Sequence, residues 1–197
     1  MEESAKIQAW IEELGHHNPD VRCQAARYLG AWGDGSGIEA LMDSLRRDAD
    51  FRVRATAASS LGHHTHPEIV EALMQGLQDS ADLVRQAAAN VLAERVNGLA
   101  DAEQSRVLPA LLACLADPDA SLRIKTALSL GLEQVTAAVP ALIDRLVAEP
   151  DPEVCEAIVN ALGWLKDSRA REALTVCLQA EDPQLRRTAR KALSMLG

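Results

Sequence analysis

Aromatic side chains are scarce in this chain of 197 residues: Phe, Trp and Tyr make up 3%, with a single Phe and a single Tyr. A hydrophobic core must therefore be built from aliphatic side chains, which favours packed helices over a β-sandwich. Hydrophobic residues still account for 48% of the chain and charged residues for 25%, as is typical of a folded domain. We therefore expect a helical protein with an aliphatic core.

Other features are missing as well. Basic residues are outnumbered, since 20 Lys and Arg stand against 29 Asp and Glu and the net charge is −9, so we expect no nucleic-acid partner. The four cysteines include no CxxC pair, which favours free thiols. The N-terminal MEESAKIQAWIEELG lacks the order of a signal peptide, and no apolar run approaches the roughly 18 to 20 residues of a membrane span. We expect a cytoplasmic protein without a membrane partner.

The chain does contain an internal repeat. An apolar anchor recurs six times at intervals of 32, 31, 38, 32 and 31 residues, and a leucine stands eight positions after each anchor. The anchors are Val21, Val53, Val84, Leu122, Val154 and Leu185. An arginine follows every anchor except the fifth, where Cys155 stands instead. Such a period is the mark of a stacked array of one recurring unit.

Each unit is predicted to be a pair of helices, because its apolar residues recur at helical spacing. The first helices are predicted within 5–14, 37–45, 68–77, 106–115, 138–146 and 171–178, and the second helices contain the anchors. Proline follows Asn18, Asp117, Asp151 and Asp182, which predicts a capping side chain and a first-turn proline. Gly30, Gly62, Gly131 and Gly163 follow the closing leucines, and we interpret them as helix terminators.

The second-helix pattern D-P-x-V-R-x-x-A-A-x-x-L-G, with Gly33-Asp34 as the following turn, resembles the HEAT repeat in its phycobilisome-lyase-type variety. Period and resemblance together predict an all-α fold, an α-α superhelix (right-handed solenoid) of six HEAT-like helical hairpins in one domain, 1–197. The repeats are expected at about 1–33, 34–65, 66–98, 99–134, 135–166 and 167–197. The resemblance also implies that the recurring arginines lie along the array beside acidic turn residues; they are Arg22, Arg54, Arg85, Arg123 and Arg186.

Three departures from the repeat are candidates for function. The segment 97–102 makes its interval about six or seven residues longer, and it is either an extended connection or helix or a protruding contact loop. Cys155 is either a small buried side chain or a nucleophile, although no histidine lies near it in sequence. His63, His64 and His66 could bind Zn²⁺ or Ni²⁺, but they lack the four fixed ligands of a structural zinc site. We predict no catalytic residue, no resident metal and no cofactor.

A partner-binding surface is expected on the second helices, which line the concave side of such arrays. Ile124 and Leu128 are apolar where other repeats are polar or small, so they either line a shallow groove or are buried beneath the longer connection. Trp164 is expected to be exposed, whereas Trp10 and Trp32 are expected to pack in the core. The residues predicted to contact a partner are Gln86, Asn90, Ile124, Lys125, Leu128, Asn160, Trp164, Arg187 and Lys191.

The last helix gathers four cations, Arg186, Arg187, Arg190 and Lys191, in an otherwise acidic chain. They either solubilise the last repeat or contact an anion or an acidic partner.

Two functions fit these observations. The first is a non-catalytic scaffold or adaptor that binds another protein or a peptide, since the chain has no Gly-rich phosphate loop, no HExxH and no Ser-His-Asp order. The alternative, which the resemblance alone implies, is a bilin lyase subunit or bilin chaperone. Such proteins handle a linear tetrapyrrole and attach it to a cysteine of a phycobiliprotein, often as two-subunit complexes. A bilin ligand is expected only under this alternative.

Overall fold

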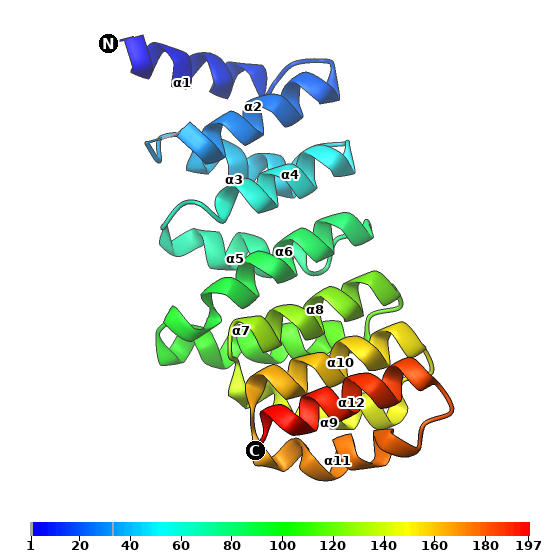
Figure 1. Ribbon diagram of the computed structural model, residues 1–197. Helices are drawn as coiled ribbons and strands as arrows, with labels where there is room; N and C mark the ends of the chain where they lie inside the picture. The colour runs from blue at the N-terminus through cyan, green and yellow to red at the C-terminus, as the bar shows by residue number, and fades with distance from the viewer. Residues whose placement is uncertain (1, 33) are drawn as a thin grey trace. The chain divides into compact units, whose positions relative to one another are not determined.

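The structure, a computed structural model, describes residues 2–32 and 34–197, and these residues form twelve α-helices in consecutive hairpins (Figure 1). The predicted all-α array of helical hairpins is therefore confirmed. Gly33, half of the predicted Gly-Asp turn, lies outside the described residues. The first helices of the hairpins are α1 (Glu2–Glu13), α3 (Ile38–Arg47), α5 (Pro67–Gly76), α7 (Asp101–Ala113), α9 (Val139–Ala148) and α11 (Arg171–Val176). The second helices are α2 (Pro19–Trp32), α4 (Phe51–Leu61), α6 (Asp82–Arg95), α8 (Ala120–Leu132), α10 (Pro152–Leu165) and α12 (Pro183–Met195).

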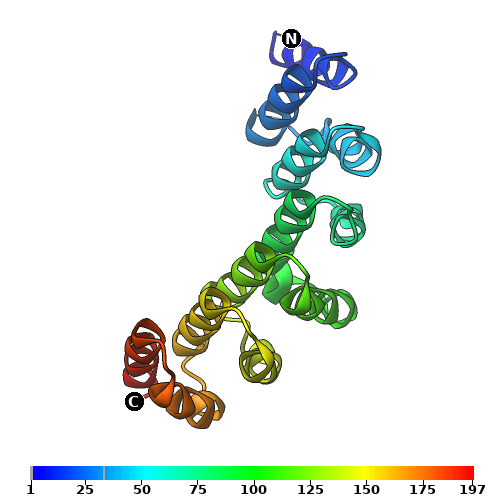
Figure 2. The ribbon, with the colours of Figure 1, turned by 90° about the vertical axis from the view of Figure 1, so that its right-hand side faces the viewer.

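The chain divides into two compact units, residues 1–92 and 93–197, with the division inside α6. In the second unit, α8, α10 and α12 pack against one another as one layer, and the first helices form the other layer (Figure 2). In the first unit, α2 packs against α4 and α3 against α5. The core between the layers is aliphatic, as the shortage of aromatic residues predicts; its largest fully buried side chains are Leu, Ile and Met. A single domain over 1–197, the right-handed course of the array and the six repeat boundaries stay predictions.

Three of the four supposed terminator glycines lie inside their helices, which corrects the sequence interpretation. α2 runs past Gly30, α8 past Gly131 and α10 past Gly163. A Cβ on Gly131 would lie 2.7 Å from the Cα of Ala161, and one on Gly163 would lie 2.9 Å from the Cα of Ala192. These glycines are required because the backbones of consecutive second helices approach closely there.

The predicted caps are confirmed at three of four second helices. The side chains of Asn18, Asp151 and Asp182 each accept a hydrogen bond from the backbone N–H two residues later, at 2.8 to 2.9 Å. The cap of α8 is Asp119, whose carboxylate accepts from Leu122 N at 2.9 Å, so the prediction of Asp117 was wrong. The carboxylate of Asp117 instead accepts from Asp119 N and stabilises the turn before the helix.

The longer interval forms helix rather than a bare loop. After α6 the chain makes a 3₁₀ turn, η1 (Val96–Gly98), and then enters α7 at Asp101. Gln104 donates to the carbonyl oxygen of Val96 at 3.1 Å, which fastens the start of α7 to this turn. The extended-helix alternative therefore describes this segment. None of the helices described for this chain has the length and apolar character that crossing a membrane requires.

Candidate functional site

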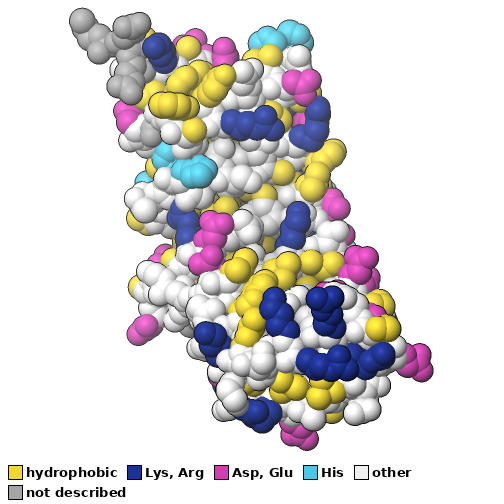
Figure 3. Space-filling view, in the orientation of Figure 1, with side chains coloured by type: hydrophobic (Ala, Val, Ile, Leu, Met, Phe, Trp, Pro, Cys, Tyr) yellow, Lys and Arg dark blue, Asp and Glu magenta, His cyan; other side chains and the backbone are white. Residues whose placement is uncertain are grey.

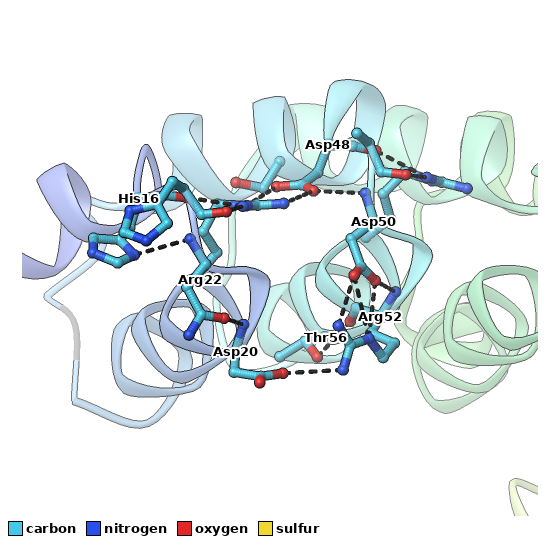
Figure 4. Close-up of polar contacts among 12 residues, drawn as sticks. His16, Asp20, Arg22, Asp48, Asp50, Arg52 and Thr56 are labelled. Atoms are coloured by element: carbon cyan, nitrogen blue, oxygen red, sulfur yellow. Dashed lines mark hydrogen bonds and ion pairs between the residues drawn. The ribbon is translucent and has the colours of Figure 1, made fainter.

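The recurring arginines, called here the arginine ladder, join consecutive hairpins. Arg22 donates from Nε and Nη2 to the two carboxylate oxygens of Asp48, both at 2.7 Å, and from Nη1 to the carbonyl oxygen of His16 at 2.8 Å (Figure 4). Arg54 repeats this fork with Asp79 at 2.7 and 2.8 Å, and its Nη1 donates to the carbonyl oxygen of Asp48 at 2.8 Å. Hydrogen bonding to these acids raises the pKa of both arginines. The ladder is therefore structural, as the resemblance implies.

A second polar network lies at the surface beside the first rung. Arg52 donates to Asp50 at 2.7 Å and to Asp20 at 3.0 Å, which links the starts of α4 and α2 (Figure 4). Thr56 donates to the carbonyl oxygen of Arg52 at 2.7 Å. Because Arg52 and Asp20 are exposed, water screens their ion pair and it contributes little to stability.

The most buried of these ion pairs lies in the second unit. Arg123 donates to both oxygens of Glu149 at 3.0 and 2.9 Å, and Arg145 donates to the same carboxylate at 2.6 to 2.8 Å. The Glu149 side chain is fully buried. Burial alone would raise its pKa, but the hydrogen bonds from Arg123, from Asp151 N and from Arg145 outweigh it and hold the pKa below the usual range.

One rung of the ladder has lost both its arginine and its acid. In the rungs of Arg22, Arg54 and Arg123 the acid stands 25 or 26 residues after the arginine, two residues before the N-cap of the next second helix. At the fifth rung Cys155 replaces the arginine, and Ala180, which is 25 residues further on and two residues before the cap Asp182, replaces the acid. Sequence reasoning found the first loss and missed the second, although the fixed spacing would have revealed it.

Cys155 is not an activated nucleophile. Only 8% of the residue is exposed, and its Sγ lies 3.5 Å from the carbonyl oxygen of Glu149, where a ladder arginine would place Nη1. Burial and the nearby carboxylate raise the pKa of this thiol. Of the two alternatives, the small buried side chain describes this residue. The other three cysteines, Cys23, Cys114 and Cys177, are also buried.

Two of the three clustered histidines serve separate local purposes. His64 is buried, with its Nε2 3.0 Å from the carbonyl oxygen of Leu29. His66 caps α5, where its Nδ1 accepts from Glu68 N at 3.3 Å. In the described part of the chain, no three His, Cys, Asp or Glu side chains converge in a way that could hold a metal ion.

The tryptophans differ from expectation. Trp32 was predicted in the core, but it is 70% exposed, because α2 continues and helical spacing places Trp32 in line with the exposed Gln24 and Tyr28. Trp10 is half-buried against Tyr28, with ring centroids 5.2 Å apart. Trp164 is half-buried, and its Cε3 lies 3.1 Å from the point that a Cβ on Gly131 would occupy. Its ring therefore covers the end of α8, a contact that the glycine allows.

The predicted partner-binding residues fall into both units. In the first unit, Gln86 is buried and Asn90 is exposed, so only Asn90 presents its side chain at the surface. In the second unit the predicted residues lie on α8, α10 and α12, which pack side by side. Ile124, Leu128, Asn160 and Trp164 are half-buried, and Lys125, Arg187 and Lys191 are exposed.

Leu132 belongs to the same surface, although sequence reasoning missed it. It lies four residues after Leu128 on α8 and is 63% exposed. The helical spacing of Ile124, Leu128 and Leu132 was the available signal, but the supposed helix end at Gly131 hid it.

Comparisons with known proteins agree with this architecture. The HEAT-repeat profile matches residues 7–93, 38–131 and 108–194. The chain is 30% identical over 198 aligned positions to the "Uncharacterized phycocyanin operon protein Z" of Pseudanabaena tenuis, covering 96% of this chain and 95% of that protein. It is 34% identical over 122 positions to the phycocyanobilin lyase subunit alpha of Synechococcus elongatus, covering 61% of this chain and 44% of that protein.

Among solved structures, the chain is similar to the complex of CpcE and CpcF of phycocyanin lyase from Nostoc sp.. The TM-score is 0.61 at 24% identity, and the match covers 96% of this chain and 76% of that chain. This likeness shows the fold.

Proposed function

The chain belongs to the HEAT-repeat family and is related to phycocyanin operon protein Z, and from this premise we propose that it is a bilin-handling protein, a chaperone or lyase subunit for attaching bilins to phycobiliproteins. The observation that carries the proposal is the identity to that operon protein along nearly the whole of both chains. The lyase subunit from Synechococcus elongatus supports it over a shorter stretch. HEAT arrays serve many functions, so the fold alone would not select this one.

The cysteines decide how such a protein would hold its bilin. A bilin is attached to protein through a thioether, and only a thiolate reacts efficiently to form one. All four thiols of this chain are buried, and burial raises the pKa of Cys155 and Cys177. We therefore propose that the chain holds the tetrapyrrole without a covalent bond, and that the acceptor thiol belongs to the phycobiliprotein.

The proposal is tested by mixing the purified protein with phycocyanobilin and recording the visible spectrum. We expect a saturable change in the visible band at about one bilin per chain, and no change when the chain is unfolded in urea. On a denaturing gel stained with zinc, bilin fluorescence should stay absent from this chain. When an apo-phycocyanin subunit is added, bilin fluorescence should appear on that subunit only if it carries its acceptor cysteine.

A second candidate is the non-catalytic scaffold that binds another protein. The surface of α8, α10 and α12 favours a scaffold function, because it combines exposed apolar and charged side chains, as protein interfaces commonly do. The same experiment separates the two functions. An unchanged bilin spectrum together with capture of the apo-subunit would support the scaffold and overturn the bilin-handling proposal.

A further inference from the structure

The exposed sides of α8, α10 and α12, called here the C-terminal helix face, form one continuous surface within the second unit. The helices are fastened to one another at several points. Gly131 of α8 lies against Ala161 of α10, and Gln134 donates to the carbonyl oxygen of Trp164 at 3.1 Å. Between α10 and α12, Thr188 donates to the carboxylate of Glu156 at 3.2 Å. A ligand on this face would therefore meet a preformed surface.

One side of this face is apolar. Ile124, Leu128 and Leu132 stand four residues apart on α8, so helical geometry places them in one row, and Leu132 is the most exposed of the three. Trp164 adds an aromatic ring at the end of that row, over Gly131. Figure 3 shows the hydrophobic side chains gathered over α8, next to Lys and Arg side chains over α12.

The other side of the face is cationic. α12 contains no acidic residue, and Arg187, Arg190 and Lys191 are exposed on it. Among the described residues, none of these three is paired with a carboxylate, whereas Arg54 and Arg123 each hold one. Three unpaired cations on one helix of a chain with a net charge of −9 make a local site for anions.

Polar groups lie between the two sides, on α10. The Oε1 atom of Glu156 accepts from Thr188 and, at 3.0 Å, from Gln184, so this oxygen is engaged by α12. One turn further on, Asn160 is half-buried, and its amide can both donate and accept hydrogen bonds. An amide at this place suits a ligand whose centre has both N–H and C=O groups.

We propose that the C-terminal helix face is the bilin-binding surface, with the tetrapyrrole rings on Leu128, Leu132 and Trp164 and the propionate carboxylates toward Arg187 and Lys191. The inference rests on the proposed function, because it assigns that ligand to a surface. An open-chain tetrapyrrole has a conjugated apolar body, pyrrole N–H and lactam C=O groups, and two carboxylates, and each of these has a counterpart on the face.

The test compares matched variants by titration with phycocyanobilin. Arg187→Gln/Lys191→Gln removes the cations, and its control is Arg46→Gln/Arg47→Gln, which removes two exposed cations from α3 in the first unit. We expect the first pair to weaken binding about three- to tenfold and the control to leave it unchanged. The dimethyl ester of the bilin, which has no carboxylates, should bind the Arg187→Gln/Lys191→Gln variant and the natural chain equally.

The apolar side is tested by Leu132→Ser, with Val147→Ser on α9 as its control, since the two residues are 63% and 82% exposed. We expect Leu132→Ser alone to weaken the binding of both the free acid and the ester. Thermal melts should show all four variants folded, because every substituted side chain is exposed.

Three outcomes would count against the proposal, and they are distinguishable. If the natural chain binds no bilin, the proposed function fails and this inference fails with it. If the natural chain binds bilin but the variants match their controls, the function stands and the C-terminal helix face is the wrong surface. If the variants lose an apo-phycocyanin subunit and keep the bilin, the occupant of the face is an acidic protein segment instead.

Discussion

The missing rung of the arginine ladder can be rebuilt, and rebuilding it tests whether these ion pairs hold the hairpins together. The perturbation is a double-mutant cycle of Cys155→Arg and Ala180→Asp. Cys155 already places its Sγ 3.5 Å from the carbonyl oxygen that a ladder arginine would use. Ala180 stands two residues before the cap Asp182, where the other rungs have an acid.

The size of the expected coupling follows from the intact rung between Arg54 and Asp79. Those side chains are 14% and 13% exposed and share two hydrogen bonds of 2.7 and 2.8 Å. Such a pair lies between exposed ion pairs, worth up to about 1 kcal/mol, and buried pairs, whose breaking costs about 3–5 kcal/mol. We therefore expect a coupling free energy of about 1–3 kcal/mol between the two substitutions.

The assay is urea unfolding of the natural chain, the two single variants and the double variant, followed by circular dichroism. Each single variant should be neutral or destabilised, because it introduces one charge without its partner. With an m-value of about 2–3 kcal/mol/M, the coupling should raise the midpoint of the double variant by roughly 0.3–1.5 M above the additive expectation. A coupling within about 0.5 kcal/mol of zero would show that the ion pairs form where the hairpins already pack and do not stabilise that packing.

The remaining predictions concern the second unit. Arg123→Met should destabilise the chain by about 3–5 kcal/mol and Arg186→Met by about 1 kcal/mol, because among the described residues Arg186 bonds only the carbonyl oxygens of Ala180 and Glu181. Urea midpoints that agree for the two variants would contradict this. The pKa of Glu149 is lower in the folded state than its ordinary 4.5. The ionised carboxylate therefore stabilises the folded chain fully above pH 4.5, and this stabilisation is lost as the pH falls through the folded pKa. The urea midpoint of the natural chain should fall more steeply below about pH 4.5 than that of Arg123→Met. Gly163→Ala should cost about 1–3 kcal/mol in thermal or urea unfolding, whereas Gly98→Ala, whose Cβ would meet nothing within 4 Å, should cost nothing measurable; equal costs would refute the close-approach explanation.

The fold could be predicted from sequence because its determinants are local and repeated. The leucine eight positions after the anchor is fully buried in the first five second helices, from Leu29 to Leu162, and Leu193 in the last is half-buried. The glycines misled the sequence interpretation because helix ends and close helix contacts both select glycine. The distance between two helices is a tertiary property, and its only trace in the sequence is a small residue about thirty positions later, such as Ala161 after Gly131.

The site was less predictable, because exposure depends on where each helix ends. Once Gly131 was taken as a terminator, Leu132 fell outside the helix and its alignment with Leu128 could not be seen. Trp32 was expected in the core because it aligns with Leu165, which is buried, but α2 carries Trp32 onto an exposed side. The cations of α12 needed no such assumption, because four basic residues and no acid within one helix can be recognised in the sequence itself.

The missing rung and the cationic helix meet in the same hairpin. The α11–α12 hairpin is attached to α10 by packing, as where Gly163 lies against Ala192, and by the hydrogen bonds that Gln184 and Thr188 donate to Glu156. It has no ladder ion pair with α10, since both partners of that rung have been replaced. Opening of a hairpin costs less where fewer buried polar contacts hold it, so α12 is the second helix of this unit whose position can adjust at the lowest cost. Under the proposed function, a surface that accepts a flexible tetrapyrrole and later releases it to another protein has a reason to carry its cations on that helix.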